Sequence, residues 1–172
     1  MPPAPRSIAN SAAIFLGDAF ASDLARPGAA LYGINPTPGR ANPMQPVVRL
    51  QARVLQLREV ASGTGVGYNA TWRAQRPSRI AIVGVGYADG WPRALSNRGS
   101  ACFDGVSYPL VGRVSMDLTA FDVTDQPRIG PGDWLELLGA GHGVEEVAAQ
   151  AGTSGYEILT SLGRRYARQW RG

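Results

Sequence analysis

The sequence contains no lysine, because all 17 of its basic residues are arginine. Chemistry that needs a side-chain amine is therefore excluded for this chain acting alone. Cysteine and histidine occur once each, at Cys102 and His142. A disulfide framework, or a metal site built from two such ligands of one chain, is excluded as well. We expect no metal, and a reducing, cytoplasmic location.

Long apolar runs and basic clusters are also missing. The N-terminal segment has only a short apolar patch, so we expect neither a signal peptide nor association with a membrane. The net charge of +4 is spread along the chain, and no basic run exceeds the pair Arg164-Arg165. We therefore expect no nucleic-acid binding.

The length of 172 residues suffices for one domain and a fraction of another. Prolines crowd residues 35–46, which predicts a linker. Before it, Asn10 and Ser11 predict the start of a short helix near Ser11. Beyond it, alternating apolar residues predict a mainly β domain of barrel or sandwich type.

Seven strands are expected, separated by clusters of Gly, Pro, Asn and Asp. They are placed at 47–54, 65–72, 79–87, 100–103, 106–111, 113–123 and 134–138. Two short helices are expected to close the domain, one beginning near Gly143 and one after Ser154.

Several residues have both a chemical and a plain structural interpretation. Asn10-Ser11 and the segment 26–29 offer hydroxyl and amide groups to a phosphate, although a helix cap and an ordinary turn explain them more simply. Tyr68 and Tyr87 lie among glycines in strand contexts. A tyrosine acting as a base needs a nearby cation such as Arg113, and packing is the alternative.

Three residues are given structural roles only. Asp117 is expected to cap or pair at a strand edge. His142, between two glycines, is expected to lie exposed on the surface. Cys102 is expected to pack as a small hydrophobic residue.

Six segments, taken in order, resemble the successive motifs of the C-terminal part of alanine racemases. They are ANSAA, ARPGAALYG, VGYNATW, VGYADGWPR, LVGRVSMD and AGTSGYEIL. Members of that family have an N-terminal (β/α)8 barrel that binds pyridoxal 5′-phosphate, followed by a C-terminal β domain. The resemblance implies that residues 1–42 are a remnant of the barrel and residues 43–172 the β domain.

The resemblance also implies a cofactor site. Ser11, the backbone of Gly28 and Ala29, and the hydroxyl of Tyr156 would hold the phosphate, with Asn10 beside it. Arg26 would face the pyridine nitrogen, which leaves the ring less able to hold a carbanion than an aspartate partner would.

The implied reaction is the interconversion of L- and D-alanine, which supplies D-alanine for peptidoglycan. The family uses two bases on opposite faces of the α-carbon, the cofactor lysine and a tyrosine that corresponds to Tyr68. Tyr87 would narrow the substrate entrance, and the backbone amide of Met116 would meet the substrate carboxylate. Arg113 and Asp117 flank that position as structural support.

The family's active site lies at a dimer interface, so the resemblance implies a homodimer or a complex with a separate N-terminal barrel fragment. Tyr68, Tyr87 and Met116 would then reach into the partner's barrel. Because the chain has no lysine, we expect it to use pyridoxal phosphate only together with the lysine-bearing barrel, and to be inactive alone. Incomplete barrel packing predicts oligomerisation or local disorder in residues 1–41.

Two alternatives remain open. The chain could be a non-catalytic dimerisation or binding module derived from a racemase. It could also be part of a racemase for serine or another small amino acid.

Overall fold

The computed structural model describes residues 4–171. The chain divides into two compact units, one that ends at Val48 and one that begins at Arg49. The predicted linker, residues 35–46, contains neither helix nor strand. No helix in the described part of the chain is long and apolar enough to cross a membrane.

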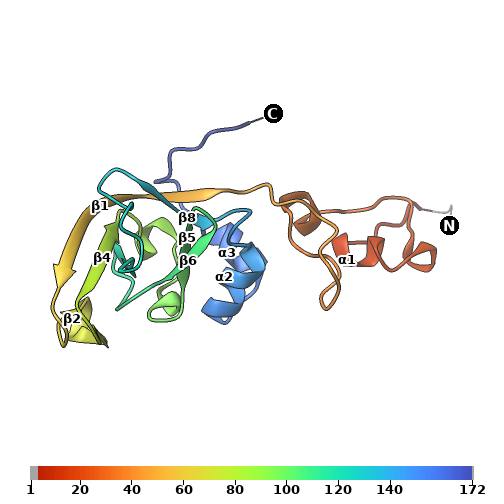
Figure 1. The fold of residues 1–172 in the computed structure, drawn as a ribbon. Coiled ribbons are helices and arrows are strands. Elements are labelled where there is room, and N and C mark those ends of the chain that lie inside the picture. Colours follow the sequence, from red (N-terminus) through yellow and green to blue (C-terminus); the bar gives the residue numbers. More distant parts are fainter. Residues whose placement is uncertain (1–3, 172) are drawn as a thin grey trace. The chain divides into compact units, whose positions relative to one another are not determined.

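The first unit consists of short helical turns joined by irregular backbone (Figure 1). These are α1 (Ser11–Ile14) and the 3-10 turns η1 (Asp18–Phe20) and η2 (Ala29–Tyr32). The Asn10 side chain caps α1 by accepting a hydrogen bond from the Ala13 amide at 3.0 Å. The prediction of a helix that begins near Ser11 is therefore confirmed.

The second unit is built on a six-stranded antiparallel sheet in the order β6-β5-β8-β1-β4-β7 (Figure 1). Its strands are β1 (Leu50–Val60), β4 (Ser78–Val83), β5 (Ser100–Phe103), β6 (Val106–Pro109), β7 (Thr119–Asp122) and β8 (Trp134–Leu138). The expectation of a mainly β domain is confirmed.

The two edges of this sheet meet. An isolated antiparallel bridge joins Leu110, just after β6, to Phe121 in β7, and the Val111 amide donates to the Ala120 carbonyl at 2.9 Å. The sheet therefore curls toward a barrel, and this contact covers backbone groups that an open edge would expose.

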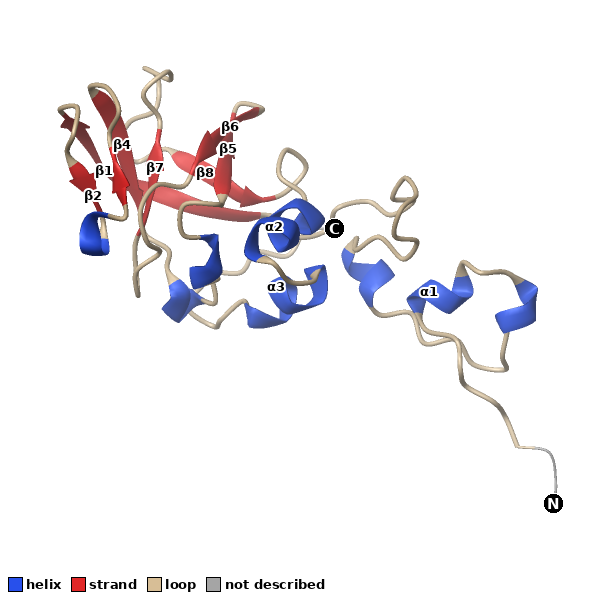
Figure 2. Cartoon of the chain, turned by 90° about the horizontal axis from the view of Figure 1, so that it is seen from below, coloured by secondary structure: helices blue, strands red, loops and turns tan. Residues whose placement is uncertain are grey.

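One apolar core lies between the sheet and the two C-terminal helices. In β1 the buried residues alternate at Leu50, Ala52 and Val54, as expected for a strand with one face in the core. The helices α2 (Val144–Ala151) and α3 (Gly155–Ser161) lie beside each other (Figure 2). They contribute residues such as Val147 and Ile158 to the same core, and both helices were predicted.

Two of the predicted strands are interrupted by turns. The strand expected at 65–72 is a small hairpin of β2 (Gly65–Val66) and β3 (Trp72–Arg73), separated by the 3-10 turn η3 (Tyr68–Ala70). Asn69 and Ala70 have positive φ, which a continuous strand does not allow. The strand expected at 79–87 ends at Val83, and Tyr87 begins the 3-10 turn η4 (Tyr87–Asp89).

The strand expected at 113–123 forms only at 119–122. The Ser115 hydroxyl donates to the Leu118 carbonyl at 2.8 Å and accepts from the Leu118 amide at 3.1 Å. These bonds close a tight turn, which replaces the strand pairing that the alternating pattern predicted. In the opposite direction, β1 continues to Val60, beyond its predicted end.

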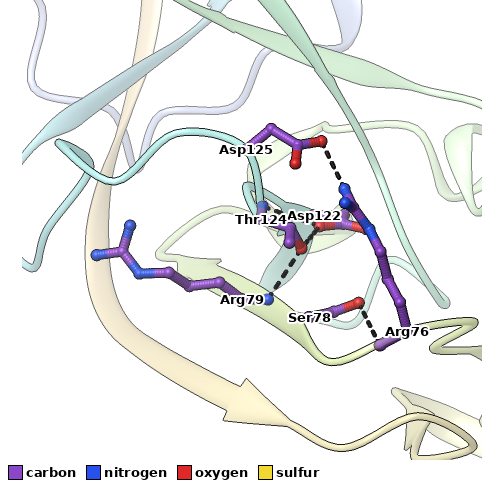
Figure 3. A network of polar contacts seen from close by, with 6 residues as sticks. All are labelled: Arg76, Ser78, Arg79, Asp122, Thr124 and Asp125. Carbon is purple, nitrogen blue, oxygen red and sulfur yellow. Dashed lines mark hydrogen bonds and ion pairs between the residues drawn. The ribbon is translucent and has the colours of Figure 1, made fainter.

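A polar network ties the start of β4 to the turn that follows β7 (Figure 3). Arg76 forms an ion pair with Asp125 at 2.5 Å, and the Arg79 amide donates to the Thr124 hydroxyl at 3.0 Å. The hydrogen bond that Arg76 donates to Asp125, and then the charge of Asp125, raise the pKa of the Arg76 guanidinium. Because Arg76 and Asp125 are both exposed, we infer that this network helps to hold the pairing register of β4 and β7 and has no catalytic role.

His142 is not exposed, which corrects the sequence-based interpretation. It is 1% exposed, with Nδ1 2.9 Å from the Leu137 carbonyl and Nε2 3.1 Å from the Ser100 hydroxyl. The loop turns back here, because the Gly139 amide donates to the His142 carbonyl. Cys102 is buried as predicted. Residues 4–171 contain no group of three or more His, Cys, Asp or Glu placed to hold a metal.

Candidate functional site

The first unit brings together two separate segments that were predicted to bind a phosphate. A parallel bridge joins Asn10 to Arg26, and the Arg26 amide donates to the Ala9 carbonyl at 2.8 Å. The Arg26 guanidinium donates to the Ile8 carbonyl at 3.1 Å. The backbones that lead to Ser11 and to Gly28 therefore run side by side.

Ser11 lies at the centre of this junction. Its side chain is buried, and its hydroxyl accepts hydrogen bonds from the amides of Gly28 at 2.9 Å and Ala30 at 3.2 Å. A Cβ placed on Gly28 would have no atom within 4 Å. These bonds hold the Ser11 hydroxyl against the backbone at Gly28, and hydroxyl and backbone amide groups are the donors that phosphate sites use.

In the second unit, Tyr68 stands on the hairpin of β2 and β3. The preceding Gly67 has φ +71°, and a Cβ there would lie 3.2 Å from the Arg113 amide nitrogen. A Cβ on Gly112 would lie 2.7 Å from the Val66 carbonyl oxygen. Only glycine permits this approach of two backbones, and it fixes the hairpin against the segment that leads to Met116.

The side chain of Tyr68 points away from the packed core. It is 69% exposed, and no residue within 4–171 hydrogen-bonds to its hydroxyl. A tyrosine that acts as a base must be buried beside a cation, and this unit does not bury Tyr68 in that way. A site that uses Tyr68 as a base needs another surface to cover the ring.

Tyr87 and Met116 are brought together by their backbones. The Tyr87 amide donates to the Ser115 carbonyl at 3.0 Å, and the Ala88 amide donates to the Met116 carbonyl at 2.9 Å. A Cβ on Gly86 would overlap both of these carbonyl oxygens. The side chains of Tyr87 and Met116 are both exposed, so they form an accessible pair on a rigid support.

Tyr156 lies in the first turn of α3, and its side chain is exposed. The end of that helix is attached to η4, because the Gly163 amide donates to the Asp89 carbonyl at 2.8 Å. Gly90 has φ +87°, and a Cβ there would overlap the Ser161 carbonyl oxygen. The helix that carries Tyr156 and the turn that carries Tyr87 therefore share one backbone junction.

Sequence reasoning missed Asp89 and Arg165, which connect these loops. Arg165 contacts Asp89 at 3.1 Å and Asp117 at 2.7 Å. Asp117 does pair, as its structural interpretation expected, although it lies in a turn and not in a strand. Asp89 stands in the same motif as Tyr87, yet its partner is distant in sequence, so a single sequence gave no signal for the pair.

Comparison with known proteins places both units in one family. Residues 47–170 match the family model described as "Alanine racemase, C-terminal domain", and residues 1–36 match "Alanine racemase, N-terminal domain". An alanine racemase of Acidiphilium cryptum is 65% identical over 94% of this chain and 45% of that protein. A catabolic alanine racemase of Mesorhizobium japonicum is 52% identical over 100% of this chain and 45% of its own length.

Solved structures agree. The alanine racemase of Bartonella henselae with covalently bound pyridoxal phosphate has a TM-score of 0.93 at 46% identity, over 98% of this chain and 47% of that chain. The biosynthetic alanine racemase of Pseudomonas aeruginosa has a TM-score of 0.92 at 44% identity, with coverage of 98% and 48%. The chain thus spans about half the length of the relatives it matches, and it belongs to the alanine racemase family.

Proposed function

We propose that this chain supplies the C-terminal part of an alanine racemase, which interconverts L- and D-alanine once the lysine-bearing part of the barrel is present. The observation that carries the proposal is the set of close glycine contacts at Gly67, Gly86 and Gly112. They hold the motifs of Tyr68, Tyr87 and Met116 on adjoining backbones while leaving the three side chains exposed.

We infer that this chain supplies part of a pyridoxal phosphate site. Ser11 and the backbone of Gly28 and Ala29, with Asn10 beside them, would hold the phosphate together with the Tyr156 hydroxyl, which belongs to the second unit. Arg26 would face the pyridine nitrogen. When bound, this cofactor withdraws electrons from the α-carbon of an amino acid and so makes its proton removable. The covalently bound pyridoxal phosphate of the Bartonella henselae relative supports this assignment.

The second unit supplies the groups that handle the substrate. Tyr68 would remove or return the α-proton on one face, while the missing lysine serves the other face. The backbone amide of Met116 would bind the carboxylate. Tyr87 would limit the size of the entrance.

The exposed side chains favour an assembly in which each second unit completes a barrel on another chain. We infer a homodimer of whole racemases, or a complex of this chain with an N-terminal barrel fragment, in the cytoplasm. In this assignment residues 1–42 belong to the barrel and residues 43–172 form the β domain. Peptidoglycan precursors are the expected destination of the D-alanine.

The test is to co-express this chain with a lysine-containing N-terminal barrel fragment and to measure D-alanine formation from L-alanine with pyridoxal phosphate. We expect racemisation by the complex and none by either part alone. The Tyr68→Phe variant should lower the rate by about 10²- to 10⁴-fold, the range for loss of a positioned acid-base group. If Tyr68 serves one face only, this variant should still exchange the α-hydrogen of one enantiomer with solvent deuterium.

Tyr108→Phe is the matched control. It removes a tyrosine hydroxyl from a buried residue that accepts from Gln126 at 3.2 Å and has no proposed role in the site, so activity should be retained. A folded, stoichiometric complex without racemisation would contradict the proposal and favour a non-catalytic dimerisation module. Racemisation of serine in preference to alanine would show that serine, and not alanine, is the substrate.

A further inference from the structure

One arginine joins the two loops that carry the proposed substrate-binding residues. Arg165 lies in the segment that follows α3, with Nε 3.1 Å from Asp89 Oδ1 and Nη2 2.7 Å from Asp117 Oδ1. Asp89 ends the turn that begins with Tyr87, and Asp117 directly follows Met116. A single guanidinium therefore bridges the Tyr87 turn and the Met116 turn.

Asp89 is a firm anchor for this bridge. It is 6% exposed, and its second carboxylate oxygen accepts from the Gly86 amide at 2.9 Å. Its carbonyl accepts from the Gly163 amide at 2.8 Å. A buried carboxylate held in this way requires a cation, and Arg165 is the cation that contacts it.

Asp117 is the exposed end of the bridge. Its side chain is 52% exposed, so the pair with Arg165 contributes little to the free energy of unfolding. The pair instead fixes the position of Asp117 relative to Asp89, because a planar guanidinium that donates to two carboxylates defines their separation. The hydrogen bond that Arg165 donates to Asp117, and then the charge of Asp89, raise the pKa of Arg165, so its charge persists at every pH relevant to the enzyme.

Backbone hydrogen bonds from Tyr87 and Ala88 also join the two turns. These bonds hold the two backbones together, and the guanidinium adds a side-chain link that ends beside Met116. We propose that Arg165 is a positioning residue that fixes the orientation of the Met116 turn relative to the Tyr87 turn and thereby sets how tightly the Met116 amide and the Tyr87 side chain receive the carboxylate end of the amino acid. This inference rests on the proposed racemase function.

The test uses this chain assembled with the lysine-bearing barrel fragment, with kcat and KM measured for L-alanine. For Arg165→Gln we expect KM to rise about tenfold and kcat to change by less than about threefold. The lost bonds position the turn that binds the substrate carboxylate, and they take no part in moving the α-proton. Arg165→Lys should recover part of the loss, because an ammonium reaches one carboxylate but does not form the planar bridge.

Arg164→Gln is the matched control, because it removes the same charge at the adjacent position. Arg164 makes no ion pair or side-chain hydrogen bond among the described residues, so its kinetic constants should equal those of the parent. Asp117→Asn removes only the exposed end of the bridge. It should reproduce most of the KM effect even if Arg165→Gln impairs folding.

A second readout does not depend on activity. Hydrogen exchange in the full chain should show faster exchange at the Tyr87 and Ala88 amides in Arg165→Gln than in the parent and in Arg164→Gln. If the parent complex does not racemise alanine, the proposed function fails, and this exchange measurement still tests the bridge. Unchanged exchange, unchanged KM, or a loss confined to kcat would each overturn the positioning role.

Discussion

The two units of this chain differ sharply in how they treat apolar side chains. The second unit encloses Trp91, Phe121 and Leu135 completely. The first unit buries only Ala9, Ala29 and Ile34 among its described hydrophobic residues. It leaves larger ones exposed, namely Ile8, Ile14, Phe15, Leu16, Phe20, Leu24, Leu31, Tyr32 and Val47. One chain therefore contains a unit with its own apolar core and a unit that leaves most of its large apolar side chains exposed.

The difference also divides the candidate site. The proposed substrate-handling residues stand on a packed sheet and its turns, whose geometry is fixed by close backbone contacts. The proposed phosphate ligands Ser11 and Gly28 stand on a unit held by hydrogen bonds and few apolar contacts. Close contacts therefore preorganise the proposed residues of the second unit, whereas those of the first unit have less support from packing.

The largest expected contrast is between core substitutions in the two units. Trp91→Ala should lower the free energy of unfolding of the second unit by about 3–5 kcal/mol, because it leaves a large cavity. Phe20→Ala, at a residue of the first unit that is 51% exposed, should change the free energy of unfolding by less than about 0.5 kcal/mol. Urea unfolding followed by circular dichroism measures both. Equal effects would mean that the first unit has a core of its own.

A smaller contrast separates two glycines of positive φ within the second unit. Gly90→Ala should destabilise the chain by about 2–4 kcal/mol for two reasons. A Cβ would clash with the Ser161 carbonyl, and the positive φ is unfavourable for alanine. At Gly105, φ is +77° and no atom lies within 4 Å of the Cβ position. Gly105→Ala should therefore show only the backbone effect of about 1 kcal/mol. Thermal unfolding distinguishes them, and equal losses would exclude a tight junction at Gly90.

Limited trypsin digestion should sharpen the boundary between the units. We expect cleavage after Arg6 and Arg40 to be at least about tenfold faster than after Arg53 and Arg79, because strand residues open only with the core. Mass spectrometry of the early fragments gives the order of cleavage. Addition of the lysine-bearing barrel fragment should protect the first unit, and failure to protect it would argue against its burial in an assembly.

The smallest expected effect concerns Tyr166, whose hydroxyl is buried without a hydrogen-bond partner. Tyr166→Phe should leave stability unchanged or raise it by up to about 1 kcal/mol at pH 7, whereas Tyr108→Phe removes a hydroxyl that accepts from Gln126 and should lower it by a similar amount. Urea midpoints provide the comparison. The opposite order would show that the Tyr166 hydroxyl has a partner in solution.

The same variant gives a test at alkaline pH. Burial first, and then the charge of Asp89, raise the pKa of Tyr166 above its ordinary value. Folding therefore favours the protonated form, and this contribution is fully present below the unfolded pKa of about 10 and is lost as pH rises beyond it. The advantage of Tyr166→Phe over the parent should grow above about pH 10. A constant difference would exclude the raised pKa.

Local signals in the sequence determined much of the architecture. Alternating residues around Leu50, the cap at Asn10 and the acidic first turn of α2 report on their own neighbours, and the corresponding elements are present. Motif order indicated the family that the comparisons show. The candidate site residues were selected in the same way, and their roles remain predictions.

Only the tertiary structure decided the features that depend on distant contacts. The alternating pattern around Ser115 predicted a strand, yet the Ser115 carbonyl accepts from the amide of Tyr87, which is distant in sequence, and the chain turns there. His142 is buried because Ser100 and Leu137 accommodate both ring nitrogens. The bridge of Arg165 between Asp89 and Asp117 likewise joins residues far apart in sequence. Propensity and periodicity are properties of adjacent residues, whereas burial and charge pairing are fixed only when the folded chain brings distant residues together.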